Sequence, residues 1–311
     1  MQLRRGLHNV PHLEQGRAVT IGNFDGVHLG HQQVLRRLIA EAERIQAISS
    51  VMIFEPQPME YFQGALAPAR LMRWHDKVQE LRRLGIEEVI VLPFNKSLQE
   101  RAADDFARTV LHRCLGARLV LMGDDFRFGC DRQGDVHFLR ARANELAMEV
   151  LDTASVSQDG ERISSTLLRT LLAQGKVEKV ADLLGRPYRI SGRVMQGDQL
   201  GRTLGFPTAN ILLRRQVSPL TGVFAVEVHT EHRTLPGVAN VGRRPTVGGT
   251  QMRLEVHLLD VSMDLYGARL DVAFLHQLRQ EQKFSSLEEL KAAIAADVAQ
   301  SRRYFREQRR A

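Results

Sequence analysis

The stretch VTIGNFDGVHLGH, residues 19–31, joins an apolar run to a turn that carries three glycines, an aspartate and two histidines. A strand that ends in glycines and leads into a helix gathers backbone N–H groups and the positive end of the helix dipole at one point, which suits a phosphate. His28 and His31, three residues apart, are expected on one side of the first helical turn. Gly30 is expected to leave room for the close approach of a ligand.

Other interpretations of the histidine pair stay open. Two histidines can fall this close by chance, and Asp25, His28 and His31 could bind a metal ion, although the sequence offers no evident further ligand. The spacing of the glycines matches neither the P-loop nor the dinucleotide-binding fingerprint.

The first part of the chain alternates apolar runs with helical patterns. The runs cover residues 18–24, 49–56, 87–94, 117–126 and 148–156, with helical patterns such as 34–42 and 78–84 between them. Strands that are apolar on both faces and joined by amphipathic helices predict a parallel sheet with helices on both sides. The first part therefore reads as a Rossmann-like α/β domain.

The rhythm changes after Gly185. Short strands are expected at 188–195, 222–230, 236–242, 253–260 and 270–276, and a capping pattern at Ser286 begins a C-terminal helix. Closely spaced strands without helices between them predict an antiparallel barrel or sandwich. We expect two domains, residues 1–185 and 186–311.

Composition and charge limit the functional classes. The 311 residues are 43% hydrophobic and 25% charged, with a formal net charge of +7. This charge suits anionic partners, and phosphates on small molecules satisfy it as well as nucleic acid does. The N-terminus has no apolar core of a signal peptide, and no window reaches the roughly 18 consecutive apolar residues of a membrane span. We expect a cytoplasmic protein with small-molecule substrates and with no nucleic-acid or membrane partner, whereas its oligomeric state is left open.

A second glycine-rich stretch, GDQLGRTLGFPTANI at residues 197–211, predicts another phosphate site. Glycines let backbone amides reach phosphate oxygens, and the hydroxyl of Thr208 and the amide oxygen of Asn210 are hard ligands that suit Mg²⁺. Glycines in a β-domain can also mark only turns. Glu255 lies on a predicted strand, with His257 on its face and Leu254, Val256 and Leu258 on the other.

Several motifs resemble one family. In the first part they are the His-x-Gly-His turn with IFEPQP (53–58), MGDDFRFG (122–129) and ISSTLLR (163–169), and in the second they are GFPTAN, GVANVGRRPTVGG, EVHLLD, DLYG and LRQEQKF. Over nearly the whole chain and in the same order, they resemble the prokaryotic bifunctional riboflavin kinase/FAD synthetase family. The resemblance implies a nucleotidyltransferase domain followed by a riboflavin-kinase-like barrel.

For the first domain, the resemblance implies transfer of AMP from ATP to FMN, giving FAD and pyrophosphate. The phosphate of FMN is already an anion, so this step needs charge stabilisation and no general base. The implied catalytic residues are His28, His31 and Arg169. The implied ATP contacts are Gly22, Asn23, Phe24, Asp25, Gly30, Ser164, Ser165 and Thr166, and the implied flavin-proximal residues are Asp125 and Phe126.

For the second domain, the resemblance implies phosphorylation of riboflavin to FMN, with Glu255 as general base and Mg²⁺ held by Thr208 and Asn210. The implied ATP contacts are Gly197, Gly201, Gly205, Phe206, Pro207, Thr208 and Asn210. The implied flavin contacts are Arg279 and Glu281. Two alternatives stay open: an adenylyltransferase acting on RNA or tRNA, and a flavin carrier without catalysis.

Overall fold

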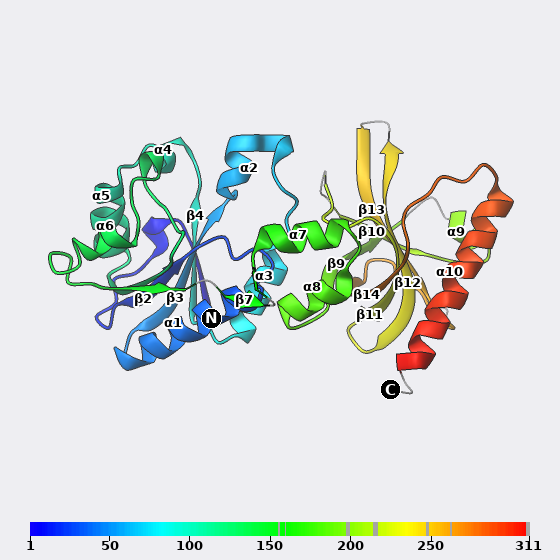
Figure 1. Ribbon diagram of the computed structural model, residues 1–311, viewed down its shortest axis with the longest axis horizontal. Helices are drawn as coiled ribbons and strands as arrows, with labels where there is room; N and C mark the ends of the chain where they lie inside the picture. Colours follow the sequence, from blue (N-terminus) through cyan, green and yellow to red (C-terminus); the bar gives the residue numbers. More distant parts are fainter. Residues whose placement is uncertain are drawn as a thin grey trace. The chain divides into compact units, whose positions relative to one another are not determined.

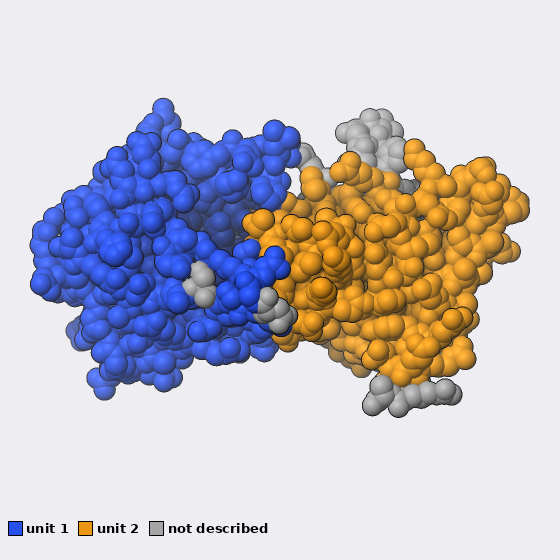
Figure 2. Space-filling view, viewed as in Figure 1, with its two compact units in different colours: residues 1–68, 74–164 blue, residues 69–73, 165–311 orange. Residues whose placement is uncertain are grey.

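The computed structural model describes residues 1–154, 156–158, 160–196, 200–213, 217–246, 249–261 and 263–308, with the backbone alone at 200, 202, 244–246 and 249–251. Gly197 therefore lies outside the described residues. The chain divides into two compact units, one of residues 1–68 with 74–164 and one of residues 69–73 with 165–311 (Figure 2).

The first unit is built on a parallel sheet of strand order β1-β4-β3-β2-β5-β6, with helices on both faces (Figure 1). Its central strands are apolar on both sides because helices cover both sides. One face packs on η3, and α1 contacts β2, β3 and β5. This confirms the predicted Rossmann-like domain.

The elements of the first unit follow the expected alternation. Their bounds are β1 Gln2–Arg5, η1 Leu7–Asn9, β2 Arg17–Ile21, α1 Leu29–Arg44, β3 Ile48–Glu55, α2 Pro58–Gln63, η2 Gly64–Leu66, α3 Trp74–Arg83, β4 Glu88–Pro93, α4 Lys96–Gln99, α5 Ala103–Asp105, η3 Phe106–Cys114, β5 Ala117–Gly123, η4 Cys130–Arg132, α6 Val136–Arg140, β6 Glu149–Thr153, β7 Ser157–Gln158 and β8 Glu161–Arg162.

A buried ion pair ties three strands of this sheet together. Arg17 on β2 is fully buried, and its Nε donates to Glu88 Oε2 on β4 at 2.6 Å. Ser50 on β3 donates to the same carboxylate at 2.9 Å. Burial alone raises the pKa of Glu88, but the hydrogen bonds and the charge of Arg17 outweigh it, so the pKa of Glu88 lies below its usual value.

The second unit is a closed antiparallel barrel of order β10-β13-β12-β11-β14-β9 with the C-terminal helix α10 packed on it. The barrel form, the second domain class and the C-terminal helix confirm the expectation from the sequence. The bounds are α7 Ser165–Ala173, α8 Val177–Leu184, β9 Tyr188–Met195, α9 Leu200–Thr203, β10 Ala209–Leu212, β11 Gly222–His229, β12 Thr234–Thr246, β13 Gly249–Leu258, β14 Arg269–Arg279 and α10 Leu287–Gln308.

The compact units divide at Ser164/Ser165, so α7 and α8 group with the barrel. Helix α8 contacts β9 and β14, which explains this grouping. The predicted domain boundary at 185/186 assigns both helices to the first domain and stays a prediction. None of the helices in the described parts of the chain combines the length and apolar character needed to cross a membrane.

Candidate active sites

The turn after β2 holds the two histidines of the first candidate site. His28 is the N-cap of α1, and its Nδ1 accepts a hydrogen bond from the backbone N–H of His31 at 3.2 Å. An accepting Nδ1 carries no proton, so the neutral ring of His28 has its N–H at Nε2. The cap therefore fixes which nitrogen of His28 can donate to a ligand.

The two imidazole rings stack, with centroids 3.6 Å apart and planes 17° apart, as the spacing of the histidines predicts. Burial lowers the pKa of His31 well below its usual value, and electrostatic coupling to His28 and the positive charge of Lys77 lower it further. A Cβ on Gly30 would lie 3.2 Å from the ring of His28. A side chain at position 30 would therefore press on the ring of His28, and close approach of a ligand to Gly30 stays a prediction.

Two polar atoms near this turn lack partners. Asn23 Oδ1 and His31 Nδ1 are buried and make no hydrogen bond to any described residue. An unpaired buried polar atom costs about 1–3 kcal/mol, so a ligand that pairs with these atoms is favoured. The backbone oxygen of Asn23 accepts from Lys77 Nζ at 2.6 Å, which brings a buried cation to the turn.

A hollow of about 540 Å³ opens at the carboxyl edge of the sheet. This phenylalanine hollow is lined by Gly22 and Asn23 after β2 and by Asp125 and Phe126 after β5, so four predicted site residues meet there. In open α/β sheets ligands bind at this edge. The other aromatic lining residues are Phe54, Phe62, Phe94, Phe106 and Phe128.

The sequence interpretation missed Lys77 and most of these aromatic residues. Phe54 and Phe94 lie at the ends of β3 and β4, with ring centroids 5.8 Å apart. Their positions at the ends of apolar runs offered a signal. Lys77 offered none, because a lysine on a helix is usually solvated.

The remaining predicted residues of this site have separate positions. Asp25 is 2% exposed, and the described residues hold no group of three His, Cys, Asp or Glu side chains placed to bind a metal. Asp125 accepts from Arg162 of the β7–β8 hairpin at 2.7 Å. Ser165, Thr166 and Arg169 belong to the second unit, where Arg169 Nε donates to Ala69 O at 2.6 Å. A role for them and for Ser164 in AMP transfer stays a prediction.

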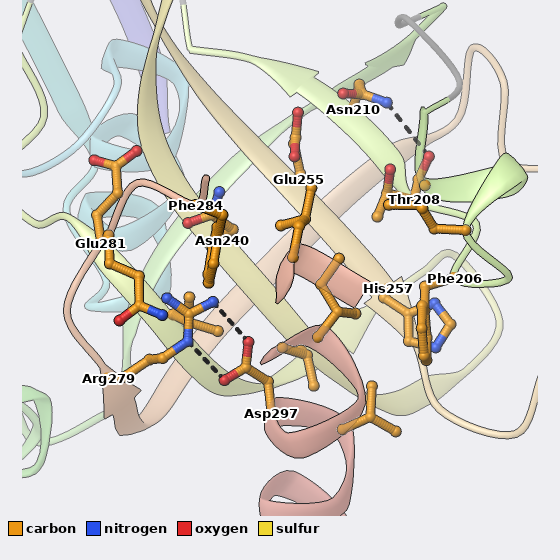
Figure 3. A pocket seen from close by; sticks show the side chains of 18 residues that line it. Phe206, Thr208, Asn210, Asn240, Glu255, His257, Arg279, Glu281, Phe284 and Asp297 are labelled. Carbon is orange, nitrogen blue, oxygen red and sulfur yellow. Dashed lines mark hydrogen bonds and ion pairs between the residues drawn. The ribbon is translucent and has the colours of Figure 1, made fainter. Parts of the chain in front are cut away.

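The second candidate site lies on one wall of the barrel. Strand β13 pairs with β10 on one side and β12 on the other, and Glu255 is the register partner of both Asn210 and Asn240. Figure 3 shows Glu255 between these two amides. The rows before and after are apolar and face away from them: Ile211–Leu254–Val241 and Ala209–Val256–Ala239.

A hollow of about 250 Å³ covers this polar row. We call it the Glu255 hollow; besides the row, it is lined by residues from the glycine-rich loop, the end of β14, the following loop and α10 (Figure 3). Predicted residues that the structure brings together here are Gly201, Phe206, Thr208, Asn210, Glu255, Arg279 and Glu281.

A second hollow of about 610 Å³, the Tyr266 hollow, shares one lining residue with the first. It is lined by Pro207, Val256 and Tyr266, among others, and Thr208 lines both hollows. Ligands in both hollows would therefore contact Thr208.

Thr208 and Asn210 carry oxygen atoms of the kind that bind magnesium. Asn210 Nδ2 donates to Thr208 O at 3.4 Å, which leaves Asn210 Oδ1 as an acceptor. Mg²⁺ binds through one or two protein oxygens and completes its shell with water and phosphate. These residues fit the ion.

The glycines of the loop act differently from one another. A Cβ on Gly201 would lie 2.5 Å from the Phe206 carbonyl oxygen, so Gly201 is needed for the fold of the loop itself. Gly205 has a φ of +88° and open space around its Cα. His257 Nδ1 lies 2.9 Å from Pro207 O, with Phe206 edge-on to its ring, and the sequence interpretation gave His257 no role.

Arg279 is held by a carboxylate that the sequence interpretation missed. Its Nε and Nη2 donate to Asp297 of α10 at 2.8 and 2.9 Å (Figure 3). Nη1 donates to Gln280 O at 3.1 Å. Three of the five N–H groups of the guanidinium are thus engaged within the protein, so Arg279 joins β14 to the helix that forms one wall of the hollow.

Comparison with known proteins identifies two family models along the chain. The FAD synthetase model matches residues 10–167, and the riboflavin kinase model matches residues 184–305. A bifunctional riboflavin kinase/FMN adenylyltransferase from Haemophilus influenzae is 47% identical over 306 residues, covering 98% of this chain and 99% of the relative. The protein of that name from Escherichia coli K12 is 47% identical over 307 residues, covering 98% of each chain.

A crystal structure from Streptococcus pneumoniae, described as a macrolide-efflux protein, matches with a TM-score of 0.82 and 29% identity. It covers 97% of this chain and 99% of its own. What the two structures share is the fold over their whole length.

Proposed function

The chain belongs to the bifunctional riboflavin kinase/FMN adenylyltransferase family, and we propose that its barrel wall and its histidine turn are the sites of the two reactions. The enzyme phosphorylates riboflavin to FMN with one ATP and adenylylates FMN with a second ATP, giving FAD and pyrophosphate. This function replaces the alternatives of an RNA-directed adenylyltransferase and a carrier without catalysis.

One observation carries the assignment of the kinase site: Thr208 lines two hollows, and Glu255 lines one of them. We place riboflavin in the Glu255 hollow, where Phe284, Leu290 and Ile294 provide apolar contacts. ATP then occupies the Tyr266 hollow, and its γ-phosphate is directed past Thr208 toward the riboflavin hydroxyl.

The kinase step needs a base because the 5′-hydroxyl of riboflavin holds its proton at neutral pH. Glu255 takes that proton as the hydroxyl oxygen attacks the γ-phosphorus, and the bond to the β-phosphate oxygen breaks to release ADP. A positioned base contributes roughly 10²–10⁴-fold to such a step. Thr208 and Asn210 are the residues that would hold Mg²⁺, which would supply charge neutralisation on the phosphates when bound.

At the first site, the phenylalanine hollow suits the flat, apolar isoalloxazine ring of FMN, because aromatic side chains stack on such rings. Asn23 lines this hollow and belongs to the histidine turn, so the FMN phosphate lies near the turn when the ring is bound. His28 donates through Nε2, and the buried Lys77 provides positive charge near His31.

In the adenylyl step, an oxygen of the FMN phosphate attacks the α-phosphorus of ATP and pyrophosphate leaves. No proton is removed from the nucleophile. The barrier is the repulsion between anions, so preorganised donors and cations lower it most. His28, His31 and Arg169 are assigned to this role, with Ser164, Ser165 and Thr166 as further ATP contacts.

The test separates the two reactions. The purified chain is incubated with riboflavin, Mg²⁺ and ATP, and the flavins are resolved by chromatography. His31→Ala is expected to block FAD formation while FMN accumulates, and Glu255→Gln to block FMN formation while added FMN is still converted to FAD. Loss of both activities in either folded variant would contradict the assignment of separate sites.

A further inference from the structure

Asn240 is the register partner of Glu255 on β12, and the family motifs gave it no role in the sequence interpretation. Directly opposed residues of antiparallel strands have Cβ atoms about 4.5–5.5 Å apart on the same face. Both residues line the Glu255 hollow (Figure 3). The two side chains therefore face the same hollow from neighbouring strands.

Other polar residues near Glu255 donate hydrogen bonds to groups other than Glu255. Asn210, its partner on β10, donates its amide nitrogen to Thr208 O. Arg279 directs Nε and Nη2 to Asp297. Asn240 flanks Glu255 on the other side. Among the described residues, its side-chain amide donates no hydrogen bond.

We propose that Asn240 is a positioning residue of the kinase reaction, whose side-chain amide donates to the Glu255 carboxylate and holds it ionised in the orientation that receives the riboflavin proton. The proposal rests on the assignment of Glu255 as general base. An amide suits this place because it donates a hydrogen bond without adding charge, and hydrogen bonds to a carboxylate favour its ionised form.

The electrostatic setting of Glu255 includes several charged groups. Arg253 and His257 lie on the same face of β13, Arg279 comes from β14, Glu281 from the next loop and Asp297 from α10. Asp297 balances the charge of Arg279. Asn240 is uncharged, so a hydrogen bond from it to Glu255 adds no charge to this setting.

The first experiment measures FMN formation by Asn240→Ala and Asn240→Asp across pH. Asn240→Ala is expected to lower kcat by about 10- to 100-fold, the loss of a hydrogen bond to a charged group, with little change in the riboflavin KM. Asn240→Asp places a like charge beside Glu255, which makes loss of its proton less favourable. The acidic limb of the pH profile of kcat is expected to move to higher pH.

Controls separate this role from a structural one. Conversion of added FMN to FAD, which uses the other site, is expected to be unchanged in both variants. Asn144→Asp adds the same charge on the exposed surface of the first unit and is expected to leave the kinase pH profile as it was. A kcat within twofold of the parent for Asn240→Ala, or a rise in riboflavin KM in place of the kcat loss, would overturn the proposal.

A double-variant cycle distinguishes failure of this proposal from failure of the base assignment. If Asn240 acts through Glu255, Asn240→Ala is expected to cause no further loss in the Glu255→Gln background. Full kinase activity of Glu255→Gln alone would refute the base assignment. A slow Glu255→Gln enzyme that loses a further factor equal to that of the single Asn240→Ala variant would refute only the role of Asn240.

Discussion

His31 is kept neutral by its surroundings, and this shapes what the histidine turn can do. Burial, electrostatic coupling to His28 and the positive charge of Lys77 lower the pKa of His31. The stacked rings, 3.6 Å apart, also disfavour a charge on both at once. The pair therefore contributes hydrogen bonds, and fixed positive charge comes from Lys77 and other cations.

The depressed pKa of His31 predicts a pH dependence of stability. The unfolded chain takes up a proton at this residue as pH falls below about 6.5, whereas the folded chain takes it up only at a lower pH. Stability is therefore lost below about 6.5, with a slope of at most about 1.4 kcal/mol per pH unit, and His31→Gln is expected to flatten this slope.

Urea unfolding at several pH values measures this effect. The single tryptophan, Trp74, lies at the start of α3 in the first unit, so its fluorescence reports on that unit. His8→Gln, which removes an exposed imidazole from the same unit, serves as the control. An unchanged slope in His31→Gln would contradict the prediction.

At the scale of elements, the sequence predicted the strands that have long apolar runs. It missed short strands with few apolar residues, which form by pairing with their neighbours. Strands β2 to β5 were predicted because runs buried on both faces are continuously apolar, and the apolar run of the edge strand β6 was predicted with them. Strand β1 is an edge strand of four residues that includes Arg4 and Arg5, and β10 is a four-residue strand next to the glycine-rich loop. Neither has enough apolar character to stand out.

The register between paired strands could not be predicted from the sequence either. Alternation showed that Glu255 and His257 share a face, but which residues lie opposite them depends on how β10 and β12 align with β13. Asn240 and Asp297 join the site only through such tertiary pairing. Residues with a local motif, such as His28 and Thr208, were found because the motif itself carries the chemistry.

Helix α10 is predicted to set the shape of the riboflavin side of the kinase site. Asp297, 5% exposed, is the buried partner that joins α10 to Arg279. Asp297→Asn removes its charge and leaves the guanidinium uncompensated, at a cost of up to about 3–5 kcal/mol in barrel stability. Since α10 lines the Glu255 hollow and not the Tyr266 hollow, the riboflavin KM is expected to rise about tenfold and the ATP KM much less.

Steady-state kinetics with each substrate varied in turn check this prediction. Asp260→Asn is the matched control, because it breaks the exposed ion pair between Asp260 and Arg302 of α10. Such an exposed pair contributes about 1 kcal/mol or less. Equal rises of both KM values in Asp297→Asn would show that α10 does not act selectively on the riboflavin side.

At the scale of the molecule, the two units are connected by more than one passage of the chain. Residues 69–73 come from the first half of the sequence but belong to the second unit. The Tyr188 hydroxyl donates to Leu71 O at 2.8 Å, and Arg73 Nη2 donates to Leu212 O and Leu213 O at 3.0 Å each. The barrel therefore incorporates a strap that its own contiguous sequence lacks.

This strap predicts that a substitution within the FAD synthetase match weakens the riboflavin kinase barrel. Arg73→Ala removes donors from two carbonyls at the end of β10, the strand that carries Asn210, and each unsatisfied group costs about 1–3 kcal/mol. After brief heating of the full chain, kinase activity is expected to be lost sooner than in the parent, while adenylylation of added FMN decays at the parental rate.

Arg82→Ala, which changes an exposed arginine of α3 in the first unit, is the control and should alter neither decay. If Arg73→Ala instead made only the adenylylation activity decay faster, residues 69–73 would be stabilising the first unit. The stability of the barrel would then not depend on the strap.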